Sequence, residues 1–371
     1  MQDFQPSLSL AVIAKNEEAT IARCLGSLHG LAGETVLVDT GSTDSTKDIA
    51  ASAGARIVDH AWSGDFSAAR NEALRHVRGR MVLFLDADEW IEPASLAELG
   101  EKAHGEADAA HYVVQVNKYP DGATVRNNVV RLFPNLPGIG FIHRIHEDVI
   151  PSLLKLGVPV RNSSIQVGHS GYEDRETVSR KSARNRSILG QAVAAGLDAE
   201  TEPHARHNLG VALFGEGDFA GALAQFEWCL ENRGPASPVG RICRLHAAEC
   251  HFKMGDFPNA LSRLPEKLEP GGHPKAFLLK GLVLEKTDPV SARPWLEAAL
   301  ACPEAPYSPP VHLPNIHLAA LAALGKIFSS TGQFAMAART LALLQNAKAQ
   351  RDRNTTGIWQ AYRSMLAEAR S

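Results

Sequence analysis

Two carboxylates follow a short apolar run in the first part of the chain. Asp86 directly follows the run Met81–Leu85, and a single residue separates it from Asp88. Carboxylates at this spacing, just past a buried strand, can converge on one hard divalent cation. Magnesium usually keeps phosphate oxygens among its ligands, so the pair predicts Mg²⁺ or Mn²⁺ together with a bound diphosphate. A solvated pair of carboxylates in a loop is the alternative interpretation.

The elements that must position these carboxylates alternate between apolar runs and amphipathic stretches. This alternation predicts strands joined by helices, and therefore a mostly parallel sheet that is covered on both faces. We expect strands at Leu8–Ala14, Thr35–Asp39, Arg56–Val58 and Met81–Leu85, and helices at about 45–53 and 66–77. Ligands bind beyond the carboxyl ends of parallel strands. The polar groups that end three of these strands should therefore meet at one edge of the sheet.

Beyond about residue 176 the expected strands stop and helical spacing continues. Gly-x-Phe turns begin at Gly217, Gly255 and Gly332. Their spacing is close to one and then two units of a tetratricopeptide repeat, a pair of helices of roughly 34 residues. A degenerate unit around Gly281 fills the gap, and Pro303–Pro314 is expected to be a loop. We therefore expect an α/β domain over 1–175, a linker helix over 176–200 and helical repeats over 201–371.

Composition excludes several other classes of protein. The formal net charge of −3 over 371 residues argues against a nucleic-acid binder. No apolar stretch reaches the roughly 18 residues that a transmembrane helix needs. The start of the chain lacks the layout of a signal peptide, so we expect a cytoplasmic protein. Neither a Gly-x-Gly-x-x-Gly fingerprint after the first strand nor a P-loop motif is found.

Four motifs together resemble family 2 glycosyltransferases of the GT-A fold, especially the bacterial subgroup with C-terminal tetratricopeptide repeats. The matching segments are Leu10–Glu18, Val38–Thr46, Asp65–Asn71 and Phe84–Trp90. Later segments look like further landmarks of that subgroup: Arg131-Leu132-Phe133, Ile145-His146-Glu147 and His169-Ser170-Gly171-Tyr172. The resemblance implies an inverting transfer of sugar from a UDP- or GDP-sugar.

The resemblance also implies roles for individual side chains around the nucleotide. Glu17 and Asp39 would contact the nucleoside, and Arg70 would lie near the diphosphate. Asp86 would approach both the ribose and the metal. The metal would be held by Asp86, Asp88 and His169. A solvated position on a helix face is the alternative for Arg70, and an ordinary core hydrogen bond is the alternative for His169.

The acidic pair Glu147 and Asp148 stands where the resemblance places the catalytic base, and the sequence leaves open which of the two acts. The acceptor is expected to be a protein, a peptide or a glycan, and the repeats could bind it or form a homodimer. Two other functions remain open at this stage. One is a sugar-phosphate nucleotidyltransferase, and the other is a non-catalytic adaptor with a vestigial transferase domain.

Overall fold

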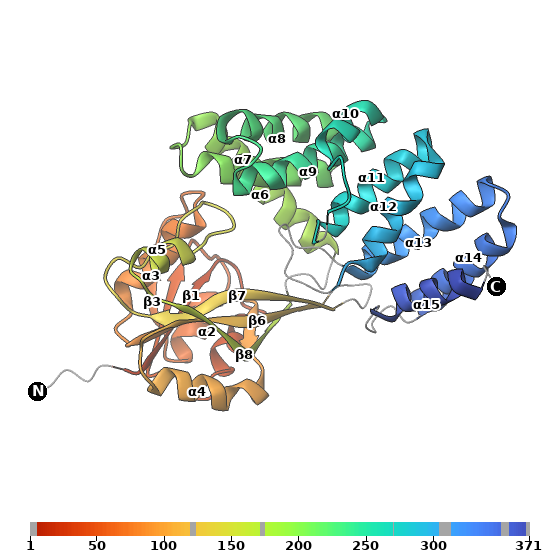
Figure 1. The fold of residues 1–371 in the computed structure, drawn as a ribbon. Helices are drawn as coiled ribbons and strands as arrows, with labels where there is room; N and C mark the ends of the chain where they lie inside the picture. The colour runs from red at the N-terminus through yellow and green to blue at the C-terminus, as the bar shows by residue number, and fades with distance from the viewer. Residues whose placement is uncertain are drawn as a thin grey trace, which may run out of the picture. The chain divides into compact units, whose positions relative to one another are not determined.

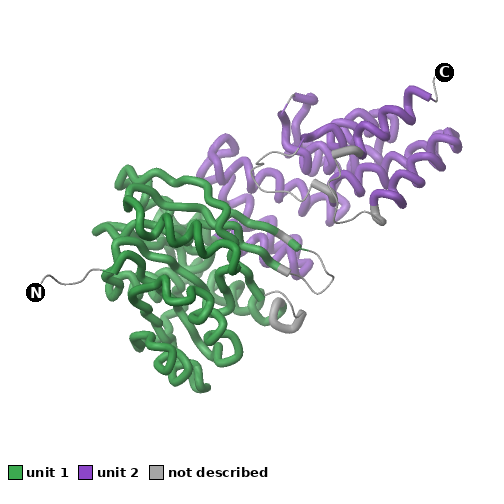
Figure 2. The backbone as a smooth tube through the Cα atoms, turned by 90° about the horizontal axis from the view of Figure 1, so that it is seen from below, with its two compact units in different colours: residues 1–205 green, residues 206–371 purple. Residues whose placement is uncertain are grey.

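The computed structural model describes residues 6–118, 124–170, 175–269, 271–303, 313–349 and 356–368. The chain divides into two compact units, Met1–Ala205 and Arg206–Ser371 (Figure 2). The predicted landmarks Gly171 and Tyr172 lie outside the described residues, as do residues 304–312 of the predicted loop. The domain limits expected at 175 and 200 remain predictions.

The first unit is built on a mixed sheet (Figure 1). The order of its described strands is β3-β2-β1-β4-β7-β6-β8-β5. The strands are β1 (Leu8–Ala14), β2 (Glu34–Asp39), β3 (Arg56–Asp59), β4 (Met81–Asp86), β5 (Glu89–Ile91), β6 (Ala110–Lys118), β7 (Thr124–Pro134) and β8 (Val160–His169). The four strands that the sequence predicts are parallel neighbours. The second half adds antiparallel pairs, because β7 runs against both β4 and β6 and β5 runs against β8.

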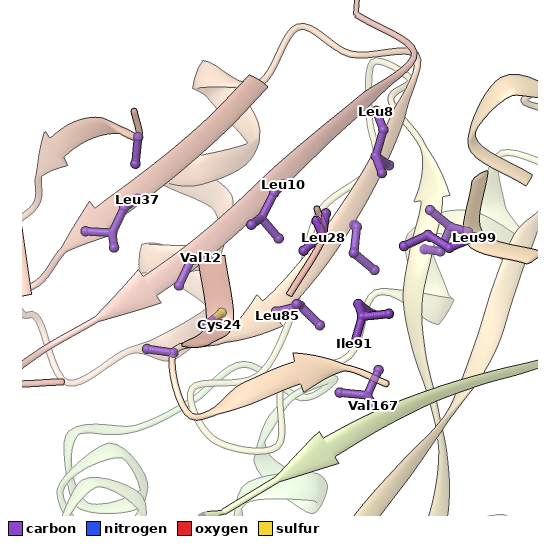
Figure 3. Packing of buried hydrophobic residues seen from close by; sticks show 14 of the residues in the cluster. Leu8, Leu10, Val12, Cys24, Leu28, Leu37, Leu85, Ile91, Leu99 and Val167 are labelled. Carbon is purple, nitrogen blue, oxygen red and sulfur yellow. The ribbon is translucent and has the colours of Figure 1, made fainter. Parts of the chain in front are cut away.

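Helices cover both faces of this sheet, as the apolar strands require. The helices of this unit up to residue 195 are α1 (Ile21–Gly26), α2 (Thr46–Ser52), α3 (Phe66–His76), α4 (Leu96–His104), α5 (Ile150–Lys155) and α6 (Arg175–Ala195). Apolar side chains of α1, α2 and α4 pack on one face, and those of α3 and α5 pack on the other. Figure 3 shows the first of these cores, where Leu10 and Val12 of β1 lie near Cys24 of α1. Ala11, between them in sequence, belongs to the opposite core.

The second unit contains helices in its described residues. With α7 spanning the division between the units, they are α7 (Glu202–Gly215), α8 (Phe219–Arg233), α9 (Pro238–Lys253), α10 (Phe257–Arg263), α11 (Pro274–Thr287), α12 (Pro289–Ala301), α13 (Leu313–Ser330), α14 (Phe334–Ala349) and α15 (Thr356–Glu368). The predicted fold class, an α/β domain followed by an all-α domain, is confirmed. In the part of the chain that is described, no helix is long and apolar enough to cross a bilayer.

The repeated turns join the helices in the way that the spacing predicts. Gly217, Gly255 and Gly332 have φ angles of +87°, +78° and +75°, which favour glycine. Asp218 follows the first of these turns, and its carboxylate accepts the backbone N–H of Gly221 at the start of α8. The degenerate unit has its own close packing, since a Cβ atom added at Gly281 would lie 2.6 Å from the side chain of Leu296.

Candidate active site

The parallel strands bring the predicted acidic residues to one edge of the sheet. In the β1–β2 register Asp39 pairs with Ala14, and in the β1–β4 register Asp86 pairs with Ile13. Both carboxylates therefore end strands that flank β1, at positions one residue apart in its register. The first and second connecting loops are also tied together, because the backbone N–H of Glu17 donates to Thr46 Oγ1 at 2.7 Å. The shared edge that the sequence predicts is confirmed.

Asp39 is a buried carboxylate with one oxygen in use. Asp39 is 1% exposed. Its Oδ2 atom accepts the backbone N–H groups of Gly41 at 3.0 Å and Ser42 at 2.9 Å. Gly41 makes this tight turn possible with a φ of +103°. Oδ1 has no hydrogen-bond partner among the described residues. A buried acceptor without a partner is costly, so this oxygen is suited to a donor supplied by a ligand.

Glu17 lies in the negative field of the neighbouring acids. Burial raises the pKa of its carboxyl, and the charges of Asp88 and Asp86 act in the same direction. The hydroxyl of Thr20 donates to Glu17 Oε2 at 2.7 Å and partly offsets this rise in pKa. The half-buried carboxyl of Glu17 therefore lies within the field of both aspartates.

Arg70 links the strand-end acids to the predicted base. Its Nη2 donates to Asp86 Oδ1 at 2.7 Å, and its Nε donates to Glu147 Oε1 at 2.6 Å. The guanidinium carbon lies 4.6 Å from the ring centre of Phe84. Arg70 is 4% exposed, so the alternative of a solvated helix face is wrong. Asp65 caps the start of α3 by accepting the backbone N–H of Ala68. Arg70 follows about one turn along this helix.

Arg131 is a site residue to which the sequence assigns no role. Its Nη2 donates to Asp86 Oδ2 at 2.7 Å and to Glu89 Oε1 at 2.8 Å. Burial alone would raise the pKa of Asp86, but the charges of Arg131 and Arg70 outweigh it and lower this pKa well below its usual range. Both oxygens of Asp86 are therefore engaged by arginines. An arginine between the apolar residues Val130 and Leu132 in a strand is the signal that could have revealed this buried partner.

Replacing Arg131 with methionine should lower the free energy of unfolding by about 3–5 kcal/mol, because the buried carboxylate of Glu89 and the half-buried carboxylate of Asp86 would lose their shared partner. Urea denaturation followed by far-ultraviolet circular dichroism measures this loss. Arg161→Met is the control, since Arg161 pairs with Asp108 on the surface and such pairs contribute about 1 kcal/mol or less. Equal losses of unfolding free energy in the two variants would show that the ion pairs of Arg131 stabilise the fold no more than a surface pair does.

Asp88 and His169 form the second cluster at this edge. Asp88 Oδ2 lies 3.3 Å from His169 Nε2 and accepts a hydrogen bond from Lys181 Nζ at 2.8 Å. The other ring nitrogen of His169 lies 2.5 Å from Asn117 Oδ1, which orients the imidazole. Burial would raise the pKa of Asp88, but the hydrogen bond and charge of His169, followed by the charge of Lys181, lower it. Burial would lower the pKa of His169, and the contact with Asp88 raises it.

These donors fit a divalent cation that also binds a diphosphate. One carboxylate and one imidazole from the protein leave the other positions to phosphate oxygens and water, as at magnesium sites that act on phosphates. Within the described ranges, no group of three or more His, Cys, Asp or Glu side chains is arranged to hold a metal. The structure thus brings Asp88 and His169 together, whereas Asp86 faces the two arginines. A metal bond from Asp86 remains a prediction.

The two candidates for the catalytic base point in different directions. Glu147 Oε1 faces Arg70 and, through it, the acids of the sheet edge. Asp148 Oδ1 accepts the backbone N–H of Ile150 at 2.8 Å, so it serves the first turn of α5. The backbone of Asp148 also pairs with Ile142. Geometry therefore favours Glu147 as the side chain that faces the acidic edge.

The sequence of this domain matches a known family. Residues 9–157 fit the model described as "Glycosyl transferase family 2". These residues are a family 2 glycosyl transferase domain. The match includes the strand ends, Arg70 and the Glu147–Asp148 pair, whereas His169 and helix α6 lie beyond it.

One of two curated relatives is similar over more of the chain than the first unit alone. A "TPR repeat-containing protein" of Synechococcus elongatus is 31% identical over 269 residues, which cover 71% of this chain and 66% of the relative. The "Putative glycosyltransferase EpsH" of Bacillus subtilis is 29% identical over 149 residues, or 38% of this chain and 43% of EpsH. The chain thus spans less than two thirds of the length of each. The repeat-containing architecture predicted from the turns agrees with the first relative.

Two solved structures show a more distant likeness to the chain. S. aureus TarS in complex with UDP-GlcNAc is 16% identical with a TM-score of 0.43, over 69% of this chain and 90% of that one. Glucosyl-3-phosphoglycerate synthase of Mycobacterium tuberculosis, in complex with Mn²⁺, UDP and glucosyl-3-phosphoglycerate, is 18% identical with a TM-score of 0.38. That match covers 52% of this chain and 82% of the synthase.

Proposed function

We propose that this family 2 domain transfers a sugar from a nucleoside-diphosphate sugar to an acceptor, with inversion at the anomeric carbon. One observation carries the proposal. Carboxylates from the ends of the two parallel strands that flank β1 share an edge with Glu147, and Arg70 connects Glu147 to Asp86 by two hydrogen bonds. An acidic edge of this kind pairs a site for a cation and diphosphate with a carboxylate that can accept a proton.

The nucleoside would be held at the ends of β1 and β2. The unpartnered Oδ1 of Asp39 would accept a hydrogen from the ribose or the base. Glu17 would contact the same nucleoside from the first loop. Arg70 would lie near the diphosphate, with Nη1 as its remaining donor, because that nitrogen is buried and has no partner among the described residues. Asp86 would approach the ribose while its arginines hold its orientation.

A divalent cation, Mg²⁺ or Mn²⁺, would be held by Asp88 and His169 and would supply charge that stabilises the departing nucleoside diphosphate. The residues of the chain perform the remaining work. Glu147 takes the proton from the acceptor hydroxyl as the new carbon–oxygen bond forms. The bond from the anomeric carbon to the phosphate oxygen breaks, and the nucleoside diphosphate leaves with the electron pair. Removal of the proton by a positioned carboxylate contributes roughly 10²–10⁴ in rate.

The acceptor would be a protein, a peptide or a glycan. Helical repeats stack into extended surfaces that bind such ligands, and the second unit would present one of these surfaces to the acceptor. The same helices could instead join two copies of the chain. Crosslinking of the protein in the presence of candidate acceptors, followed by mass spectrometry, would distinguish the two uses. Crosslinks from the repeats to an acceptor support the first use, and crosslinks between two copies of the chain support the second.

Incubation with UDP- and GDP-sugars in the presence of Mn²⁺ tests the proposed transfer. We expect slow hydrolysis of one donor class without acceptor, measured as release of UDP or GDP, and faster release once an acceptor is added. The competing reaction uses a nucleoside triphosphate and a sugar 1-phosphate. Release of inorganic diphosphate from that mixture, with intact donors in the first, would identify a nucleotidyltransferase instead.

A further inference from the structure

Helix α6 (Arg175–Ala195) brings positive charge to the acidic edge, beyond the region that matches the family model. Lys181 Nζ donates to Asp88 Oδ2 at 2.8 Å, and these residues are separated by 93 positions in the chain. The Lys181 ammonium therefore neutralises the same carboxylate oxygen that faces His169. Helix α6 belongs to the first compact unit, together with the strands that carry the site.

Arg184 stands on the same face of α6, because residues three apart are neighbours on a helix. Its guanidinium carbon lies 4.9 Å from the ring centre of Phe66 at the start of α3. Burial lowers the pKa of Arg184, whereas the charges of Glu147, Asp88 and Glu17 act to raise it. These three carboxylates come from separate loops, so the guanidinium lies within the field of the whole site.

The hydrogen bonds of Arg184 differ from those of the buried arginines. Arg70 and Arg131 each bind two carboxylates of the edge. Arg184 donates from Nε and Nη2 to Asn185 Oδ1, its neighbour on the helix, and forms no ion pair with a carboxylate of the described residues. Arg184 is exposed on the surface of α6, so an incoming anion can reach its guanidinium directly. Arg184 is therefore placed to bind an anion that enters the site.

Arg70 and Arg131 offer an approaching diphosphate little net positive charge, because their charges are balanced by Asp86, Glu89 and Glu147. It would also meet the charges of Glu17 and Asp88. Additional positive charge is needed next to the site, and α6 supplies it with two side chains on one face. When a divalent cation binds Asp88, like charges within a few ångströms repel Lys181 from that carboxylate. The phosphates bound to the same cation are the nearest anions for the displaced ammonium.

We propose that Lys181 and Arg184 of α6 bind the diphosphate of the donor, and that Lys181 exchanges Asp88 for a phosphate oxygen when the cation arrives. This inference rests on the proposed function and extends it to a second phosphate-binding element outside the sheet. Without nucleotide, Lys181 occupies the place of the cation at Asp88. With nucleotide, the same side chain closes over the phosphates.

Isothermal titration with UDP and GDP, each with Mn²⁺, and with uridine and guanosine tests this role. Lys181→Met and Arg184→Met should each weaken binding of the diphosphate about tenfold, because each removes a charged hydrogen bond to a phosphate. Affinity for the nucleoside alone should not change. Arg186→Met is the matched control, since Arg186 is two residues from Arg184 and projects about 200° around the helix from it. Lys181→Arg should keep most of the affinity, because it retains the charge.

Binding of Mn²⁺ without nucleotide gives an independent measurement. Lys181→Met should bind Mn²⁺ more tightly than the wild type, because the competing ammonium is gone, and electron paramagnetic resonance of free Mn²⁺ reports this change. Unaltered UDP and GDP affinity in both α6 variants, with a wild type that binds one of them, would overturn the α6 proposal and leave the proposed function standing. A wild type that binds neither nucleotide with Mn²⁺ would overturn both.

Discussion

Replacing Asp88 with asparagine should weaken binding of the preferred nucleoside diphosphate in the presence of Mn²⁺ by about 100-fold or more. Loss of residues that only support metal ligands already costs about 10–100-fold in metal affinity, so loss of a direct ligand should reach at least the upper end. The substitution keeps the shape of the side chain and removes its charge. Isothermal titration with and without a chelator measures the effect as the ratio of the two affinities.

The Asp88 variant has a second consequence that a simple loss of fold would not produce. Asparagine leaves Lys181 and His169 without the carboxylate that neutralises them. Binding of the nucleotide in chelator should therefore stay the same or rise, while the gain from Mn²⁺ disappears. Asp108→Asn is the control, because Asp108 forms an exposed pair with Arg161. A Mn²⁺ response in Asp88→Asn equal to that of the wild type would remove the metal assignment.

The sequence predicts the parallel half of the sheet well because buried parallel strands are continuous apolar runs. The limits predicted for β1 are those observed, Leu8–Ala14. Strand β4 extends one residue beyond its predicted end, to Asp86. The position of the acids also follows from sequence, since strands in parallel register end together. Asp39 and Asp86 are therefore found on the same edge without any knowledge of tertiary contacts.

The antiparallel half was not predicted from the sequence, although it carries a signal. In β6 the inward positions are interrupted by polar residues such as Gln115 and Asn117, and these contact Glu89 and His169 of the site. Apolar runs are therefore shorter there than in β1 or β4. A strand that contributes side chains to a polar site loses the pattern by which strands are recognised.

The partners of the site residues are the part that spacing cannot supply. The hydrogen bond from Arg70 to Glu147 joins residues 77 positions apart, and the bond from Lys181 to Asp88 joins residues 93 positions apart. Periodicity identifies the face of a helix but not the carboxylate that it meets. The sequence accordingly left open a solvated Arg70 and left Lys181 without a role. Both answers required the packed arrangement of α3 and α6 against the sheet edge.

Replacing Glu147 with glutamine should lower the rate of donor hydrolysis by roughly 10²–10⁴-fold, with little change in nucleotide affinity. The amide keeps the size of the side chain and its oxygen can still accept from Arg70, but it cannot take up a proton from the attacking hydroxyl. The loss should therefore fall on kcat, measured as UDP or GDP release at saturating donor. Water replaces the acceptor in this assay, so the acceptor need not be known.

Asp148→Asn is the matched control for this pair of adjacent acids. Asparagine retains the oxygen that accepts the Ile150 N–H, so the first turn of α5 should be preserved. Its hydrolysis rate should stay within about threefold of the wild type, because Asp148 faces its own helix while Glu147 faces Arg70. The opposite pattern, with an active Glu147→Gln and an inactive Asp148→Asn, would transfer the role of base to Asp148. It would also require the loop that carries both acids to change conformation when the donor binds, because only then could the Asp148 carboxylate reach the acidic edge.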